Sequence, residues 1–328
     1  MKGRKPVLLY YKILRWRECN IKQLHRCFDV VVLDDPRQDT DALLSRVEIL
    51  LAPLGFMCDK EKMDRMPRLK IIASNTTGHP HINVEYATSR KIKVLTLKDD
   101  QVFLSRITPT AELTWGLIIA VTRNLIPAAK SVLEGRWDRR PYGGRAMLSR
   151  MSLGLIGYGR LGKLVGSYGR SFGMTVRYYD PFVDGKDPGI ERIENLENLL
   201  RLSDVVSLHV PHEPETENLL NRHMFNFFKK GGYLINTSRA ELVDEDALID
   251  ALERNILAGA AVDVLAGEFD PDFSQHVAAS KLVAFARRND RLLITPHIGG
   301  STKDAWELTE RRTVDRVCDE LGIGSQCE

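Results

Sequence analysis

The chain has 328 residues, which is more than one hydrophobic core usually holds, so we expect two domains. Its composition, 43% hydrophobic and 28% charged, is that of an ordinary globular protein, and a net charge of +3 without long basic runs argues against nucleic-acid or membrane binding. No stretch approaches the roughly 20 apolar residues of a membrane span. Five scattered cysteines without a CxxC pair favour a reducing compartment, and we expect a cytoplasmic protein.

The first hundred residues alternate short apolar runs with polar, helix-like segments. The apolar runs predict strands, which lie within 7–11, 29–34, 48–55, 69–74 and 93–97. The segments between them predict helices within 15–28, 39–47 and 83–91. Strands that alternate with helices are typical of βαβ units, so this region predicts a parallel α/β sheet.

A second alternating series begins at Met151. Before it, Thr-Pro-Thr introduces an apolar-rich stretch that predicts one long helix ending at Gly135, and a loop rich in Arg and Gly follows. The later strands are predicted within 152–159, 175–180, 204–210, 231–238, 257–265 and 291–297. The tail, 301–322, predicts one amphipathic helix.

These elements predict an α/β protein of two domains. A Rossmann-type doubly wound parallel sheet, residues 105–298, is inserted into a smaller flavodoxin-like α/β substrate domain made of residues 1–104 and 299–328.

Between the first strand and the first helix of the second series lies Gly157-x-Gly159-x-x-Gly162. The first glycine permits a tight turn, the second allows the backbone to approach a pyrophosphate, and the third lets helix and strand pack closely. Asp180 ends the next strand, where a carboxylate can accept hydrogen bonds from an adenosine ribose and repel a 2′-phosphate. The pattern predicts an NAD site and favours NAD over NADP.

Three later strands each end at a polar side chain: Arg239, Glu268 shortly after its strand, and His297. Parallel strands place their carboxyl ends at one edge of a sheet, so these groups can converge. A histidine can donate or accept a proton near neutral pH, a carboxylate orients it, and a guanidinium binds a substrate carboxylate through two hydrogen bonds. Taken singly, they are equally well explained as a loop cation, a solvated turn residue and a strand-end cap.

The motifs GLIGYGRLG, HVPHEPET, INTSRAELVDEDAL, GAAVDVLAGE and ITPHIGGST resemble those of the D-2-hydroxyacid dehydrogenases, a family that includes phosphoglycerate, glyoxylate/hydroxypyruvate and D-lactate dehydrogenases. The resemblance implies that Arg239, Glu268 and His297 are catalytic, with His297 as the acid/base. It also implies NAD contacts beyond Gly157, Gly159, Gly162 and Asp180, from Arg160, Leu161, Pro211, Thr216, Thr237, Asp263 and Gly299.

The loop Ser-Asn-Thr-Thr-Gly, 74–78, resembles the family's substrate loop. The resemblance implies that the backbone N–H groups of Thr76, Thr77 and Gly78 bind the substrate carboxylate together with Arg239, with Asn75 beside them. It also implies a homodimer formed through the region of the predicted helix 110–127, which carries more apolar surface than a hinge requires.

The chain departs from the family pattern at several positions. Ala240 stands where Gly is usual, Phe269 where Pro is usual, and the substrate loop continues as Gly-His-Pro-His-Ile-Asn, without two usual acids. The segment from Glu268 to His297 is longer than usual, and its part 274–288 predicts an added amphipathic helix that either packs on the domain edge or partly covers the cleft.

The region after the third strand, Ala52-Pro53, lacks the arginine of phosphoglycerate enzymes, which argues against a phosphorylated substrate. Glu268 stands where formate dehydrogenases have an amide, whereas phosphite oxidation stays compatible with the same residues. We therefore predict an NAD-dependent oxidoreductase acting on a D-2-hydroxy or 2-keto acid, with no metal. The alternative is an NAD-binding regulatory protein of corepressor type on the same scaffold.

Overall fold

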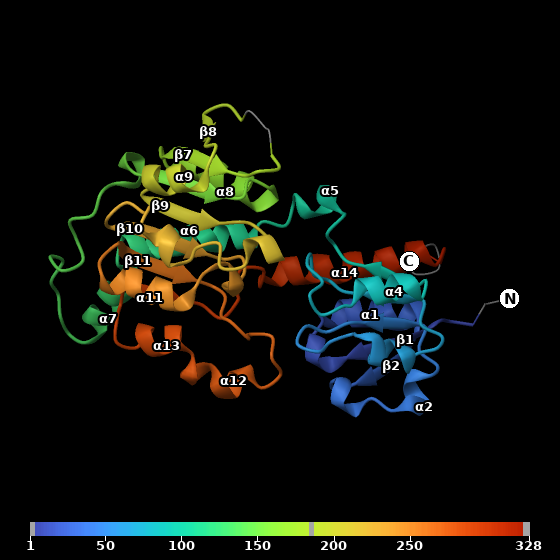
Figure 1. Ribbon diagram of the computed structural model, residues 1–328. Coiled ribbons are helices and arrows are strands. Elements are labelled where there is room, and N and C mark those ends of the chain that lie inside the picture. Colours follow the sequence, from blue (N-terminus) through green and yellow to red (C-terminus); the bar gives the residue numbers. More distant parts are fainter. Residues whose placement is uncertain (1–3, 184–186, 324–328) are drawn as a thin grey trace. The chain divides into compact units, whose positions relative to one another are not determined.

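The computed structural model describes residues 4–183 and 187–323. The chain forms two compact units, which are described separately (Figure 1). The first contains Met1–Ile107, Phe269–Pro271 and Thr302–Glu328, and the second contains Thr108–Glu268 and Asp272–Ser301. The terminal residues 1–3 and 324–328, which belong to the predicted substrate domain, lie outside the described residues.

The first unit is built on a five-stranded parallel sheet with the order β2-β1-β3-β4-β5, the flavodoxin-like order that we predicted. Its strands are β1 (Val7–Tyr11), β2 (Asp29–Leu33), β3 (Ile49–Leu51), β4 (Ile71–Ala73) and β5 (Lys93–Leu95). Its helices are α1 (Glu18–Cys27), α2 (Asp41–Leu44), α3 (Lys60–Asp64), α4 (Val84–Ser89), α5 (Gln101–Leu104) and α14 (Lys303–Glu320), with 3₁₀ turns at Lys12–Leu14 and Pro36–Gln38.

Both faces of this sheet are buried, which explains why β1 consists of five buried apolar or aromatic residues in a row. Leu8 and Tyr10 contribute to one core, whereas Leu9 and Tyr11 contribute to the other. The predicted tail helix is confirmed as α14. Its buried Val314 and Val317 belong to the same core as Leu24 of α1.

The second unit is built on a seven-stranded parallel sheet with the order β12-β11-β10-β9-β6-β7-β8. Counted along the chain this order is 7-6-5-4-1-2-3, the Rossmann arrangement with one further strand, so the predicted fold class is confirmed. Its strands are β6 (Ser152–Ile156), β7 (Thr175–Tyr179), β8 (Ile190–Arg192), β9 (Val205–Leu208), β10 (Gly232–Asn236), β11 (Leu257–Val262) and β12 (Leu292–Ile294). Strand β8 has no counterpart in the sequence prediction.

Helices pack on both faces of this sheet (Figure 1). The helices of this unit are α6 (Pro109–Thr122), α7 (Leu125–Leu133), α8 (Arg160–Ser171), α9 (Leu196–Leu202), α10 (Arg222–Phe225), α11 (Glu245–Glu253), α12 (Phe273–His276) and α13 (Lys281–Ala286). Within the described residues of this unit, 3₁₀ turns lie at Leu148–Arg150, Pro214–Thr216, Ala240–Leu242 and Val277–Ala279.

The single long helix expected before Met151 is wrong, because the chain breaks between α6 and α7. Asn124 adopts a left-handed conformation at φ 52°, and the chain bends by 63° between the helical stretch that ends at Thr122 and the helix Leu125–Leu133. The break places Pro127 in the first turn of α7, where its missing N–H leaves no helical hydrogen bond unmade. Within the described residues, no single helix is long and apolar enough to cross a membrane. The bent pair that ends at Leu133 meets the requirements of length and apolar composition, and nothing more.

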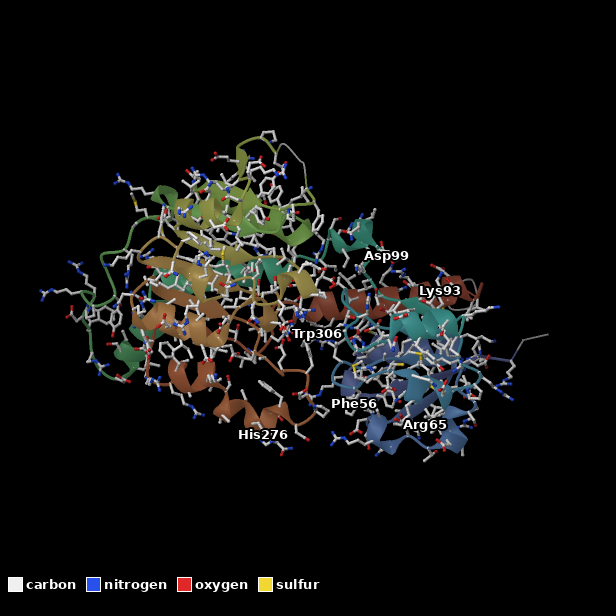
Figure 2. All side chains as sticks on the ribbon, in the orientation of Figure 1. Phe56, Arg65, Lys93, Asp99, His276 and Trp306 are labelled. Carbon is white, nitrogen blue, oxygen red and sulfur yellow. The ribbon has the colours of Figure 1, made fainter. Side chains whose placement is uncertain are left out.

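The helix expected within 274–288 is confirmed as helical structure but not as one continuous helix. The segment forms α12, a 3₁₀ turn and α13, and Ser280, in an extended conformation at ψ 134°, separates the last two. Leu282 and Phe285 are buried in the core of the second unit, against which Phe273 and Val277 also pack. The segment 272–288 therefore packs on the edge of its own unit, and His276 lies exposed on it (Figure 2).

The cysteines differ from one another. Cys19, Cys58 and Cys318 form no disulfide, and Cys27 is disulfide-bonded, which the expectation of reduced cysteines did not include. Cys327 lies outside the described residues.

Candidate active site

The turn after β6, residues 157–162, is called the glycine turn below. Gly157 has φ 91°, and a Cβ there would lie 2.7 Å from both the His209 carbonyl oxygen and Val210 Cγ1. A Cβ on Gly162 would lie 2.3 Å from the Gly157 carbonyl oxygen. A Cβ on Gly159, the residue that precedes α8, would meet nothing within 4 Å. Gly157 and Gly162 are therefore tightly packed against other protein atoms, whereas the space beside Gly159 is empty.

Asp180, which follows β7, fastens the glycine turn. Its carboxylate accepts hydrogen bonds from the backbone N–H groups of Tyr158 and Phe182, both at 2.8 Å. The Tyr158 ring stacks on Tyr178 of β7 with centroids 4.0 Å apart, so a side chain of the turn also packs against the sheet. Open space at Gly159 and the N-terminal end of α8 directly after it suit the pyrophosphate of NAD, so these residues fit the cofactor.

The other predicted cofactor residues lie in the same unit. Leu161 packs against the core that contains Tyr158, and burial lowers the pKa of the Arg160 guanidinium. The Thr216 hydroxyl donates to the Pro211 carbonyl oxygen at 2.8 Å. The hydroxyl of Thr237, at the end of β10, hydrogen-bonds that of Thr114 on α6, also at 2.8 Å. These two hydroxyls therefore already have protein partners.

Strands β10, β11 and β12 are neighbours and run parallel, so the residues that follow them lie along one edge of the sheet. Arg239 follows β10, Asp263 follows β11 and His297 follows β12. Arg239 is partly buried, and among the described residues no carboxylate lies within ion-pair distance of it. Its positive charge is consequently available to an anion.

Asp263 holds the turn after β12, residues 295–299, called the histidine turn below. The buried carboxylate accepts from the Thr295 hydroxyl at 2.6 Å, from the Ile298 N–H at 2.9 Å and from the Gly299 N–H at 2.7 Å. Its carbonyl oxygen accepts from the His297 N–H at 2.9 Å. His297 itself has φ 51°, a left-handed conformation that is rare for a residue with a side chain.

Glu268 and His297 are brought together. Glu268 Oε1 lies 2.8 Å from His297 Nδ1, and their side chains are 12% and 34% exposed, respectively. The carboxylate is therefore largely shielded, while the imidazole still reaches solvent. An imidazole held at Nδ1 by a carboxylate presents Nε2 for proton transfer.

His209, which the sequence analysis did not single out, lies beside the glycine turn. It is partly buried, its Nε2 lies 2.9 Å from the Ser207 hydroxyl oxygen, and desolvation by the surrounding protein lowers the pKa of its imidazole to about 3. The signal in the sequence was its place directly after β9, next to the predicted glycine fingerprint in space.

The predicted substrate loop belongs to the first unit, after β4. The hydroxyl of Thr76 donates to the Gly78 carbonyl oxygen at 2.5 Å and contacts that of Ser74 at 2.9 Å. Among the described residues, the backbone N–H groups of residues 75–78 donate to no protein acceptor. They are free to bind an anion. His81, which follows them, is 4% exposed, and burial lowers its pKa to about 4.

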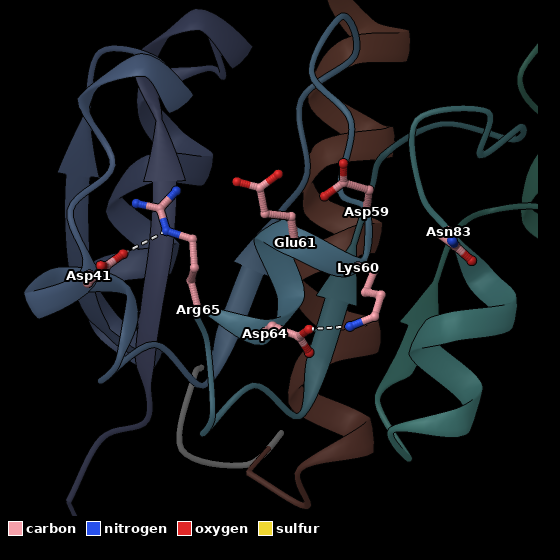
Figure 3. A pocket seen from close by; sticks show the side chains of 7 residues that line it. All are labelled: Asp41, Asp59, Lys60, Glu61, Asp64, Arg65 and Asn83. Atoms are coloured by element: carbon pink, nitrogen blue, oxygen red, sulfur yellow. Dashed lines mark hydrogen bonds and ion pairs between the residues drawn. The ribbon is translucent and has the colours of Figure 1, made fainter.

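A hollow on the first unit lies outside this set of residues (Figure 3). It is lined by seven side chains, among which Arg65 pairs with Asp41 at 2.7 Å and Lys60 with Asp64 at 2.8 Å. Over the described parts of the chain, no group of His, Cys, Asp and Glu could hold a metal ion, and no metal was predicted.

The second unit combines a Rossmann sheet and its glycine turn with a histidine–carboxylate pair that lies after β11 and β12. This combination is typical of nicotinamide-dependent oxidoreductases. Residues 115–299 match the family model described as "D-isomer specific 2-hydroxyacid dehydrogenase, NAD binding domain". The chain belongs to the D-isomer specific 2-hydroxyacid dehydrogenase family.

Three relatives illustrate the match. Glyoxylate reductase of Thermofilum pendens is 36% identical over 88% of this chain and 84% of its own. D-3-phosphoglycerate dehydrogenase of Methanocaldococcus jannaschii is 32% identical over 82% of this chain but only 49% of its own. The crystal structure of D-lactate dehydrogenase from Aquifex aeolicus, complexed with NAD and lactic acid, has a TM-score of 0.80 at 28% identity and covers 98% of this chain and 97% of its own.

These matches confirm the predicted class, an NAD-dependent oxidoreductase of 2-hydroxy or 2-keto acids. Nothing in them favours the regulatory alternative.

Proposed function

We propose that this enzyme interconverts a small, unphosphorylated 2-keto acid and its D-2-hydroxy acid, with Glu268 and His297 as the acid–base pair and Arg239 as the cation that binds the substrate carboxylate. The observation that carries the proposal is the 2.8 Å pair of Glu268 and His297 at the sheet edge to which Arg239 also belongs. The assignment of 1–104 plus 299–328 to substrate binding and of 105–298 to NAD binding is part of the same proposal.

In the direction of reduction, protonated His297 donates its Nε2 proton to the carbonyl oxygen of the keto acid. Glu268 accepts a hydrogen bond from the Nδ1–H group throughout, so it fixes the ring orientation and stabilises the imidazolium. Bound NADH supplies the hydride for the carbonyl carbon. The reverse reaction uses the same groups, with neutral His297 as the base.

Support for an unphosphorylated substrate comes from the first unit. The buried end of β3 continues into Ala52 and Pro53, which bring no positive charge. The free N–H groups of residues 75–78 supply hydrogen bonds for one carboxylate. We propose that Asn75 lies beside that carboxylate and that glyoxylate, hydroxypyruvate and pyruvate are the compounds to test first, since relatives named for glyoxylate and D-lactate match this chain.

The test is NADH oxidation with those three keto acids and with phosphohydroxypyruvate. We expect turnover with at least one unphosphorylated acid and a loss of kcat of about 10³-fold or more in His297→Ala. Arg239→Lys keeps the charge but loses the bidentate geometry, so we expect its KM to rise more than its kcat falls. Turnover of the phosphorylated acid alone would refute the substrate class, and NADH binding without any turnover would favour the regulatory alternative.

We also propose a cytoplasmic homodimer. The support for the dimer is an exposed apolar surface on the second unit, where Leu125, Ile126, Leu133 and Trp137 are 52–90% exposed. Light scattering at micromolar concentration should give about twice the mass of the 328-residue chain. Leu133→Asp should shift the protein to monomers, and a monomeric wild type would refute the dimer.

A further inference from the structure

Two buried threonines of the second unit, Thr114 on α6 and Thr237 directly after β10, hydrogen-bond each other through their hydroxyls at 2.8 Å. The strand β10 that precedes Thr237 ends at Asn236, whose carbonyl oxygen accepts from the N–H of Asp263 at 2.9 Å. Asp263 follows β11 and His297 follows β12, and the three strands are parallel neighbours. Thr237 therefore lies at the same edge of the sheet as the histidine turn.

The direction of the hydrogen bond between the two hydroxyls follows from a third atom. The Thr114 hydroxyl oxygen lies 2.7 Å from the carbonyl oxygen of Thr110, one helical turn earlier. A carbonyl oxygen can only accept, so the single hydroxyl proton of Thr114 is used in that bond. The Thr237 hydroxyl must then donate to Thr114. Its proton is consequently committed, and Thr237 offers a ligand only the remaining acceptor capacity of its oxygen.

The polar groups on either side of Thr237 are engaged by the protein. Asn236 donates with Nδ2 to the Arg239 carbonyl oxygen at 2.8 Å and accepts with Oδ1 from the Ser238 N–H at 3.0 Å. The Ser238 hydroxyl donates to the Leu208 carbonyl oxygen at 2.8 Å. These bonds hold the backbone on both sides of Thr237, so the position of its hydroxyl is fixed as well as its polarity.

Asp263, at the same edge of the sheet, has little acceptor capacity left. Its carboxylate accepts three hydrogen bonds from the histidine turn, whereas an ionised carboxylate has about four acceptor positions. The Thr237 hydroxyl oxygen is thus a second acceptor at this edge, and one whose proton cannot turn toward a ligand.

We propose that Thr114 is a positioning residue for nicotinamide: by accepting the Thr237 hydroxyl proton, it leaves Thr237 as a pure acceptor that binds the NH₂ group of the nicotinamide carboxamide. The inference rests on the proposed assignment of residues 105–298 to NAD binding. A carboxamide has a donor side and an acceptor side, so an acceptor of fixed polarity selects one of its two orientations. The opposite orientation would place two acceptors against each other and leave both unsatisfied.

The test compares the Kd of NADH with that of reduced 3-acetylpyridine adenine dinucleotide, in which a methyl group replaces the NH₂ group. Fluorescence titration without substrate measures both. Thr114→Val removes the hydroxyl at nearly constant volume, and Thr114→Ser keeps it. The control is Thr122→Val, because Thr122 is also buried on α6 and its hydroxyl donates to the Ile118 carbonyl oxygen one turn earlier, at 2.6 Å.

We expect the wild type to bind NADH about 3- to 10-fold more tightly than the analogue, which is the effect of one hydrogen bond. In Thr114→Val the Thr237 hydroxyl loses its acceptor and can donate to a ligand oxygen, so this preference should fall to within about twofold. Thr114→Ser and Thr122→Val should keep the wild-type preference. If Thr114→Val does not fold, Thr114→Ala removes the same hydroxyl and should give the same loss.

Three results would overturn the inference and leave the proposed function standing. Equal binding of the two dinucleotides by the wild type shows that Thr237 does not select the carboxamide NH₂ group. A wild-type preference in Thr114→Val or Thr114→Ala shows that Thr114 does not set the polarity of Thr237. An equal loss of preference in Thr122→Val shows a general effect of altering α6. Failure of the wild type to bind NADH would refute the proposed NAD site, and this inference with it.

Discussion

The glycine turn and the histidine turn follow strands of the same sheet, and each passes through a left-handed residue. In the glycine turn this residue is Gly157, at φ 91°, and the missing side chain removes the strain. In the histidine turn it is His297, at φ 51°, which keeps its side chain. Such a residue costs about 1 kcal/mol or more and needs support from its surroundings.

Each turn is supported by one aspartate that follows a neighbouring strand of the sheet. Asp180 accepts two backbone N–H groups at the glycine turn. Asp263 accepts three donors with its carboxylate and a fourth with its carbonyl oxygen at the histidine turn. A turn that approaches a ligand with its backbone can place glycine at the left-handed position. A turn that presents a side chain from that position needs hydrogen bonds to hold its conformation.

Gly157→Ala should give the largest loss of stability among the variants of the two turns. The new Cβ would contact the His209 carbonyl oxygen at 2.7 Å in an unfavourable backbone conformation, so we expect a loss of about 3 kcal/mol or more in the free energy of unfolding. Urea denaturation measures it. Gly159→Ala, whose Cβ meets nothing, should lose less than about 1 kcal/mol while still weakening NADH binding; equal losses in both variants would contradict the steric argument.

Asp263→Asn tests the support of the histidine turn. An amide keeps the shape but places an NH₂ group against one of the backbone donors, so we expect a loss of about 2–3 kcal/mol and a lower kcat. Thermal unfolding and initial rates measure the two effects. A variant with wild-type stability and kcat would show that the turn holds its conformation without the carboxylate.

Acid should weaken the glycine turn through His209. Its folded-state pKa is lowered to about 3 by burial, whereas a free histidine titrates near 6.5, so the unfolded chain binds the proton first as the pH falls. The stabilisation is complete above pH about 6.5 and falls by up to about 1.4 kcal/mol per pH unit toward pH 3. Denaturation at pH 7, 6 and 5 should show a shallower decline in His209→Asn, whereas the exposed control His276→Gln should keep the wild-type slope.

The two glycines after His297 give the smallest effects. A Cβ on Gly299 would lie 3.0 Å from Asp263 Oδ2 and 3.3 Å from Thr110 Cγ2, so Gly299→Ala should lose about 1 kcal/mol of stability and raise the KM for NADH. Gly300→Ala, with nothing within 4 Å, should stay within about 0.5 kcal/mol of wild type. Indistinguishable variants would show that Asp263 can move to accommodate a methyl group.

The sequence predicted the two sheets because buried parallel strands appear as apolar runs, and it predicted the glycine turn because that pattern records backbone geometry. It predicted from the strand ends that Glu268 and His297 could converge, and the family resemblance implied that they pair. Neither the break at Asn124 nor the irregular 272–288 segment was predicted, since both depend on packing rather than on periodicity. The hydrogen bonds of Asp263 were beyond prediction for the same reason: they join residues 32–36 positions apart.

The return of α14 to the first unit has a consequence for biosynthesis. Val314 and Val317 complete the core around Leu24, yet the ribosome makes them after the entire second unit. The Rossmann sheet can therefore fold before α14 is synthesised, while part of the apolar surface of the N-terminal strands is still exposed. The first unit is therefore begun first, but its core can be completed only after the second unit has been synthesised.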